Sequence, residues 1–345
     1  MPRLACFLVL IIAGILPWSI DPGQAAPAPA VLHPQVDPIT HGHLVETLPG
    51  SKLSLRLAPV PGGVFLLGSP PTEKGRRPHE GPQRRVRIRP FWMSTTEITW
   101  DLYDLYRGKG VTSQKVNENL LAANADAVTR PTLPYIDETW GHGRSRYPVL
   151  GISHHAAMEF CHWLSKTTGR FYRLPTEAEW EWACRAGSST AFSHGDDLTS
   201  LGKFAWYDTN ANDTTHPVGS KIANAWGLFD MHGNVAEWCL DAYHATAYAD
   251  LSPGALHLHP FRLPGSARYP HVVRGGSYAD AASACRSAAR VASAPAWNQA
   301  DPQVPQSIWW LANEAAVGFR VVRAVEEQPG LRGHRSKVTA RSPDR

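Results

Sequence analysis

The chain has 345 residues, of which 43% are hydrophobic and 19% are charged, and its formal net charge is +4. This length and apolar content suffice for one large domain with a core, and 28 glycines and 29 prolines favour a loop-rich globular protein over a helical bundle or a disordered chain. Because five of the basic residues lie within positions 331–345, we expect no nucleic-acid partner for the domain itself.

The N-terminus is typical of an export signal. Arg3 precedes an apolar run over residues 4–16, and small residues around Ala25 fit a cleavage site. The thirteen residues of this run are fewer than the roughly 20 that span a bilayer. We therefore predict a signal peptide over residues 1–25, export to the periplasm or the extracellular space, and no stable membrane span after cleavage; an uncleaved anchor is the alternative. Residues 26–52 are rich in proline and predict an extended linker.

Three elements are expected in the next part of the chain. Apolar and polar residues alternate over Ser54–Ser69 and over Arg84–Phe91, which predicts a strand in each segment. The stretch Ile98–Tyr106 carries Trp100 and Tyr103 on one apolar stripe and predicts a short helix.

Two further helices have clear start and stop signals. Ser153 is a typical N-cap, and Gly169 ends the helix that it begins. In the segment RLPTEAEWEWACRAG, Thr176 and Glu179 form a T-x-x-E capping box, and Gly187 is the expected left-handed stop. The two tryptophans of this segment are expected in the core.

The cysteines indicate disulfides. Four of them remain once the signal peptide is removed: Cys161, Cys184, Cys239 and Cys285. An even number of cysteines in an exported protein predicts disulfides, and four cysteines allow three connectivities. We favour the pairs Cys239–Cys285 and Cys161–Cys184. Buried free thiols that pack as small hydrophobic groups are the alternative.

Three segments carry glycines and tryptophans at positions that amphipathic periodicity does not demand. They are RLPTEAEWEWACRAG (173–187), WGLFDMHGNVAEW (226–238) and VVRGGSY…CRSAAR…GFRVVR (272–323). In this order they resemble the formylglycine-generating enzyme family, also called sulfatase-modifying factors, and the resemblance runs from Pro61 to Ala324. It implies one compact α+β domain that is poor in regular secondary structure and related to the C-type-lectin fold.

The resemblance also suggests the domain bounds. We expect the family domain over residues 53–325, and the polar residues 326–345 predict a disordered tail. Two stretches, residues 107–148 and 293–316, are longer than a minimal family member needs and are expected to be insertions.

A structural calcium ion is implied by the resemblance. In the family, calcium lies at the glycine-asparagine loop before the Glu-Trp pair, which here implies side-chain ligands from Asp230 and Glu237 and backbone carbonyls from Gly233 and Val235. Calcium prefers several oxygen ligands, and two carboxylates on either side of a tight turn supply them. The alternative is that Asp230 and Glu237 merely cap turns.

The catalytic chemistry of the family requires a pair of cysteines after the GGS triplet, which bind copper(I) and oxidise a cysteine of a sulfatase to formylglycine. Here the segment is GGSYADAASACRSAAR, and Asp280 stands at the first cysteine position when counted from GGSY. Cys285 falls on the second position in that count, but on a non-catalytic one in the gapped alignment that we prefer. The pair is absent in both cases, so copper is not expected. Cys285 and Ser277, which matches a serine of the family's groove, are the remaining catalytic candidates.

Histidines offer a different metal chemistry, because some relatives hold iron with them. His154, His155 and His162 fall on or near one predicted helix, and His257 and His259 form an H-x-H pair. No carboxylate or further histidine is placed convincingly beside either group, so satisfied surface or core histidines are the preferred interpretation.

Together these observations predict an exported family member without the paired cysteines, which acts as a binding or accessory protein on a polypeptide or a glycan. The alternative is an oxygen-dependent oxidoreductase of different chemistry. Sulfatase modification through Cys285 is the least favoured of the three hypotheses. The sequence leaves open whether any catalysis is retained.

Overall fold

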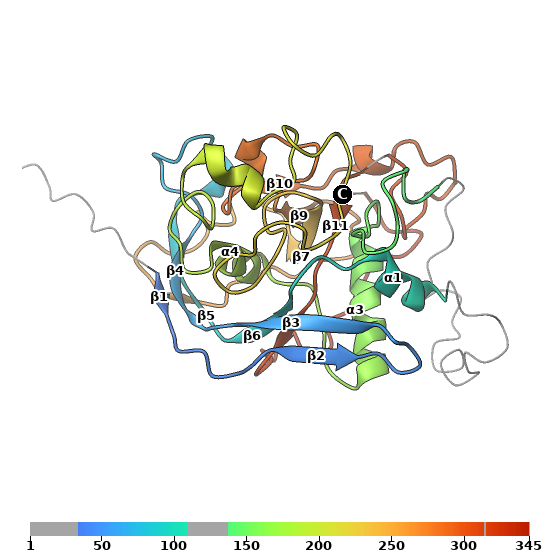
Figure 1. Ribbon diagram of the computed structural model, residues 1–345, viewed down its shortest axis with the longest axis horizontal. Coiled ribbons are helices and arrows are strands. Elements are labelled where there is room, and N and C mark those ends of the chain that lie inside the picture. The colour runs from blue at the N-terminus through green and yellow to red at the C-terminus, as the bar shows by residue number, and fades with distance from the viewer. Residues whose placement is uncertain (1–33, 109–136, 314, 345) are drawn as a thin grey trace, which may run out of the picture. The chain divides into compact units, whose positions relative to one another are not determined.

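The structure, a computed structural model, describes residues 34–108, 137–313 and 315–344. The predicted signal peptide, residues 1–25, and most of the predicted insertion at 107–148 lie outside these ranges. Small sheets, few helices and many loops make up the fold (Figure 1), which confirms the predicted α+β class. No helix within the described ranges is long and apolar enough to cross a lipid bilayer.

The strands of the described residues form three sheets of four strands each. The first has the order β1 (Gln35–Val36), β4 (Gly63–Leu67), β5 (Arg84–Ile88) and β8 (His257–Leu258). The second has the order β10 (Arg290–Ala292), β9 (His271–Arg274), β7 (Ala236–Ala242) and β11 (Val317–Gly318). The third has the order β12 (Val322–Ala324), β6 (Phe91–Ser94), β3 (Ser54–Val60) and β2 (Leu44–Thr47). Neighbouring strands are antiparallel, except for the parallel pairs β5–β8 and β7–β11.

The single strand predicted over Ser54–Ser69 is divided into two. β3 and β4 belong to different sheets, and the chain leaves one for the other at Pro61–Gly62. At Gly63 a Cβ atom would lie 2.3 Å from the carbonyl oxygen of Gln35 and 2.7 Å from the ring of Trp182, so only glycine allows this close approach. The other predicted strand corresponds to β5, although its last residue already belongs to β6.

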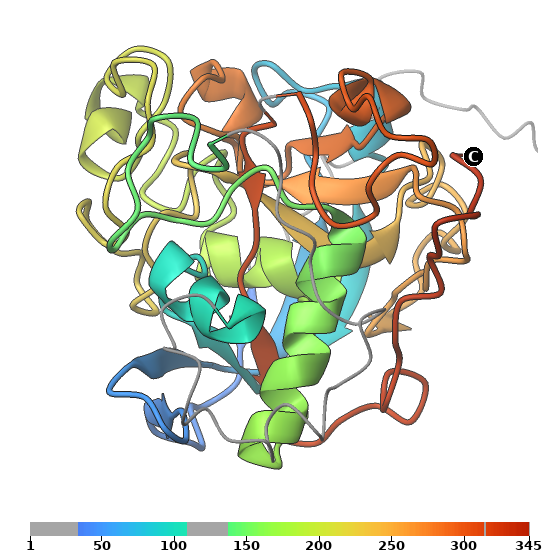
Figure 2. The same ribbon diagram turned by 90° about the vertical axis from the view of Figure 1, so that its right-hand side faces the viewer.

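The α-helices of the described residues are α1 (Trp100–Arg107), α3 (His154–Thr168) and α4 (Glu177–Arg185). The predicted caps of α3 are confirmed, because Ser153 accepts the N–H of Ala156 and Gly169 is left-handed with a φ of 66°. The capping box of α4 is also confirmed, whereas its left-handed stop is Ala186, one residue before the predicted glycine. Figure 2 shows α1 beside α3, and the two helices are in contact.

Two apolar clusters form most of the core. One gathers around α1 and α3 and contains Trp100, Phe160 and Trp238. The other surrounds α4, where Trp180 and Trp182 are completely buried, as the sequence predicts for this segment. Because α4 contacts β4, β5, β7 and β9, it joins the first sheet to the second.

Buried ion pairs fasten the same helix to the second sheet. Arg274 at the end of β9 pairs with Glu181 at 2.6 Å, and Arg290 at the start of β10 pairs with Glu177 at 2.6 Å. Both glutamates belong to α4. Removing one partner of such a pair leaves a buried charge without compensation, so these contacts fix the position of β9 and of the turn that follows it.

Both ends of the described chain are more ordered than predicted. Within the expected linker at residues 26–52, β1 pairs with β4 and β2 pairs with β3. The expected disordered tail at residues 326–345 packs on the domain in its described part: Leu331 is buried, and Glu327 pairs with Arg173 at 2.9 Å. Composition does not reveal such order, because it arises from partners elsewhere on the domain.

The predicted disulfides are not present. All four cysteines of the described residues are free thiols and are buried: Cys161, Cys184, Cys239 and Cys285. They are distributed over three apolar clusters, where they pack as small hydrophobic groups. Burial raises the pKa of every one of these thiols, that of Cys184 to about 12.

Candidate functional site

A groove with a volume of about 390 Å³ lies beside the turn that follows β9. The turn consists of Gly275 and Gly276, whose φ angles are 93° and 68°. A Cβ atom at Gly276 would lie 2.8 Å from the Sγ atom of Cys285, so glycine is needed where these two segments pass each other. Ser277 and Asp280 come directly after the turn, and both line the groove.

Small apolar side chains form most of the groove walls. Each strand of the second sheet contributes at least one of them, including Ala236, Val273, Val291 and Val317. The predicted insertion at residues 293–316 adds Trp297 and Asn313. This stretch therefore forms a wall of the groove. No pattern in its sequence predicts that role.

Ser277 and Asp280 are joined by hydrogen bonds. Ser277 donates its hydroxyl to Oδ2 of Asp280 at 2.6 Å and its backbone N–H to the same atom at 2.9 Å. The backbone carbonyl of Asp280 in turn accepts the N–H of Asp208 at 3.1 Å. The carboxylate is thus held in a fixed place at the groove, while its Oδ1 atom keeps its capacity to accept hydrogen bonds.

Cys285 does not line the groove. Its side chain is completely buried in a small cluster with Phe192, Leu201 and Ala205, and burial raises its thiol pKa. The carbonyl oxygen of Cys285 accepts a hydrogen bond from the buried ring of His232 at 2.8 Å. Of the two predicted catalytic candidates, the structure brings Ser277 to the groove and places Cys285 behind its wall.

Glu237, a predicted calcium ligand, is instead the partner of an arginine. Arg320 donates to both of its carboxylate oxygens at 2.7 Å, and Trp180 donates its indole N–H to Oε2 at 2.7 Å. All three side chains are buried. A calcium ion on this carboxylate would lie beside a guanidinium, so Glu237 does not fit the predicted role.

The other predicted ligands are in a different environment. Asp230 accepts the N–H of Gly219 through Oδ2 at 2.6 Å, and its buried carboxyl also lies within hydrogen-bonding reach of the side chain of Glu97. Burial followed by the charge of Asp230 raises the pKa of Glu97. The carbonyl groups of Gly233 and Val235 follow on the same loop. The two carboxyl groups can therefore share a proton without any cation, and calcium at this loop stays a prediction.

The histidines singled out by the sequence are dispersed. His154 stacks on His271, with ring centroids 3.9 Å apart, and donates to the carbonyl of Cys239 at 3.0 Å. His155 instead contacts Ser336 at 2.8 Å. The H-x-H pair divides similarly, because His257 binds the carbonyl of Ser252 and His259 accepts the N–H of Arg89. Across the described ranges, no group of three or more His, Cys, Asp or Glu side chains is arranged to hold a metal ion.

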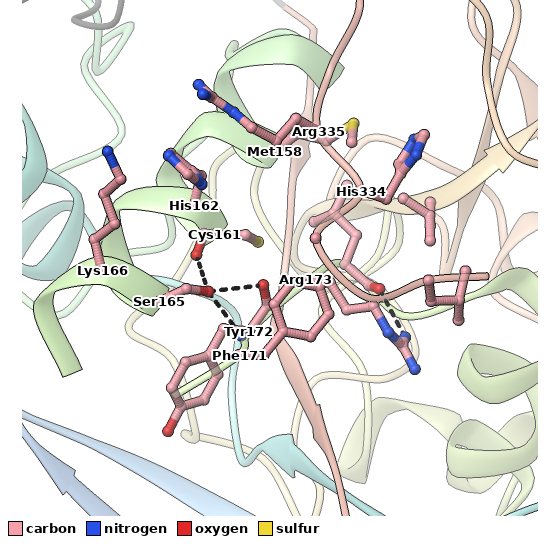
Figure 3. A pocket seen from close by; sticks show the side chains of 14 residues that line it. Met158, Cys161, His162, Ser165, Lys166, Phe171, Tyr172, Arg173, His334 and Arg335 are labelled. Atoms are coloured by element: carbon pink, nitrogen blue, oxygen red, sulfur yellow. Dashed lines mark hydrogen bonds between the residues drawn. The ribbon is translucent and has the colours of Figure 1, made fainter. Parts of the chain in front are cut away.

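His162 lines a second cavity of about 280 Å³ between α3 and the C-terminal segment (Figure 3). Figure 3 shows His162 and Lys166 on the helix, with His334 on the facing segment. The cavity also contains Arg335, which is paired with Glu159 at 2.6 Å. The lining also includes Lys166 and Arg173, so the charged side chains of this cavity are basic, whereas the groove contains the carboxylate of Asp280.

Comparisons with known proteins show the family of this chain. Residues 56–325 match the model of the family described as "Sulfatase-modifying factor enzyme 1-like domain". The chain therefore belongs to the sulfatase-modifying factor family, to which formylglycine-generating enzymes also belong.

Individual relatives extend over most of the domain. The formylglycine-generating enzyme of Streptomyces coelicolor is 31% identical over 277 residues, which cover 68% of this chain and 83% of that protein. The inactive C-alpha-formylglycine-generating enzyme 2 of Bos taurus is 30% identical over 231 residues, which cover 57% and 74%. The solved structure of PvdO from Pseudomonas aeruginosa has a TM-score of 0.58 and 28% identity, and the match covers 80% of this chain and 96% of that one.

Proposed function

We propose that this chain is an exported binding or accessory member of the family, which takes a polypeptide segment in its groove and does not perform copper-dependent oxidation of a sulfatase cysteine. One observation carries the proposal: the groove contains the carboxylate of Asp280, held by Ser277, whereas the thiol of Cys285 is buried outside it. Copper(I) prefers soft thiolate ligands to carboxylate oxygens, so the groove suits binding better than copper chemistry.

The composition of the groove favours a polypeptide over a glycan. Its polar side chains are Ser277, Asp280, Asn313 and the ion-paired Arg274, and the other walls are apolar. Apolar walls with a few placed polar groups are typical of sites for ligands with apolar parts. The relative from Bos taurus that is named inactive supports the use of this scaffold without the oxidation reaction.

Two measurements on the purified mature protein test the proposal. Elemental mass spectrometry after incubation with Cu(I), Fe(II) or Ca²⁺ is expected to find no stoichiometric copper or iron; either metal retained through buffer exchange would overturn the proposal in favour of an oxidoreductase. Peptide and glycan arrays are then compared between Ala296→Trp, which fills the groove at an exposed position, and Ala300→Trp, an exposed control outside its lining. Peptide binding that only Ala296→Trp abolishes is the expected result, and binding to glycans alone contradicts a polypeptide ligand.

A further inference from the structure

Asp280 has no cationic partner among the described residues. Both hydrogen bonds that hold it come from Ser277 and end on Oδ2, and neither a hydrogen bond nor an ion pair engages Oδ1. Arg274 also lines the groove, but its guanidinium is neutralised by Glu181, which lies 2.6 Å away on the side of α4. The groove therefore carries a negative charge that the protein itself does not compensate.

Alkyl and aromatic surface surrounds this charge. The strands of the second sheet contribute small side chains such as Val273, Val291 and Val317, and the stretch 293–316 contributes the half-buried ring of Trp297. Such walls pack against methylene groups, and an indole ring attracts a cation over its face. A volume of about 390 Å³ lies within the range of sites for drug-sized ligands, so a long side chain and the adjoining backbone have room.

We propose that the groove recognises a lysine side chain of its polypeptide ligand, with the ammonium group on Oδ1 of Asp280 and the methylene stem along the apolar walls. This inference rests on the function proposed above and specifies its ligand. Lysine fits better than arginine, because a guanidinium binds a carboxylate best through two parallel hydrogen bonds. Here Ser277 already engages Oδ2, which leaves one oxygen for a point charge.

A phage-displayed library of random heptapeptides, selected on the full mature protein, tests the inference. Three proteins are compared: the wild type, Asp280→Asn and Asp208→Asn. The first variant removes the charge while keeping an oxygen that accepts the bonds from Ser277. The second removes one negative charge from an exposed side chain close to Asp280 but outside the lining of the groove. Unchanged thermal unfolding of both variants is confirmed first, and Asp280→Ser replaces Asp280→Asn if the latter does not fold.

We expect lysine to be enriched at one position of the peptides selected by the wild type and by Asp208→Asn, but not by Asp280→Asn. For a selected peptide made synthetically, replacing that lysine by glutamine lowers affinity about tenfold on the wild type and leaves it unchanged on Asp280→Asn, while arginine restores it in part. Lysine enrichment that persists on Asp280→Asn overturns the inference. Selected peptides without lysine overturn it too, but leave the proposed polypeptide function standing. If no peptide is enriched on any of the three proteins, the proposed function fails as well.

Discussion

The buried ion pairs that hold the fold together, here called the scaffold, differ from the groove in how their charged side chains are compensated. In the scaffold, Arg320 makes two hydrogen bonds of 2.7 Å to Glu237, one to each carboxylate oxygen. In the groove, Asp280 keeps one carboxylate oxygen without a partner. An uncompensated charge is most costly where water is excluded. The contrast teaches that the paired charges serve the fold, whereas the charge of the groove is available to a partner from outside.

The largest effect is expected from breaking the scaffold pair. Glu237→Ala leaves Arg320 buried without its carboxylate partner, which lowers the free energy of unfolding by about 3–5 kcal/mol. Urea unfolding followed by circular dichroism measures the change. The matched comparison is Asp280→Asn, for which we expect a change below about 0.5 kcal/mol. Similar losses for the two variants would show that the two regions do not differ as described.

The second effect concerns histidines that the scaffold keeps neutral. Burial lowers the pKa of His271 to about 4, so between pH 6.5 and 4 the unfolded chain binds a proton there that the folded chain does not. The stability that this histidine contributes is therefore complete above pH 6.5 and is lost as the pH falls towards 4. His271→Phe keeps an aromatic ring in place of the stacked imidazole and removes the titration.

We expect His271→Phe to lose about 3 kcal/mol less stability than the wild type between pH 7 and pH 4. Urea unfolding at half-unit steps of pH measures both curves, with His244→Gln as the control at an exposed position. Burial raises the pKa of Asp241 to about 7 and works in the opposite sense, which is why the difference between variants is measured rather than one curve. Parallel curves for the wild type and His271→Phe would contradict the prediction.

The smallest effect concerns Asp230, an exception within the scaffold, because its buried carboxyl lies beside Glu97 and makes no ion pair with a described basic residue. If calcium binds there, free calcium at 100 times its dissociation constant stabilises the wild type by about 2.7 kcal/mol and leaves Asp230→Ala unchanged. Melting temperatures with calcium and with EDTA report the difference. Because Glu237 is paired with Arg320, Glu237→Ala is expected to retain the calcium response on a less stable protein. Equal calcium responses in the wild type and Asp230→Ala would exclude the site.

Local features of the fold were predictable because their causes are local. Ser153, Gly169 and the capping box at Thr176 act within a few residues, and the helices begin or end where these signals indicate. The sequence does not reveal the change of sheet at Pro61–Gly62, because alternation continues through it and the close approach at Gly63 depends on distant partners, the carbonyl of Gln35 and the ring of Trp182.

The site was predictable in its position but not in its construction. The GGS segment indicated the groove and the replacement of a cysteine by Asp280. The wall formed by Trp297 comes from a stretch without a recognisable pattern, and the burial of Cys285 depends on Phe192, Leu201 and Ala205, which lie far from it in the sequence. The pairing of Glu237 with Arg320 joins residues 83 positions apart, so no local pattern distinguishes an ion pair from a metal ligand there.

Chemical labelling of the buried thiols can show which part of the molecule unfolds. Cys184, Cys239 and Cys285 are enclosed in apolar clusters, so a water-soluble thiol reagent reaches them only when that part of the chain unfolds, whereas Cys161 also lines the cavity beside α3. Cys161 belongs to the cluster around α1 and α3, Cys184 and Cys239 to the one around α4, and Cys285 to the one behind the groove. The labelling rates of Cys184, Cys239 and Cys285 therefore measure how often their clusters open. A faster rate at Cys285 than at the other two would distinguish opening at the groove from unfolding of the whole domain, without any engineered probe.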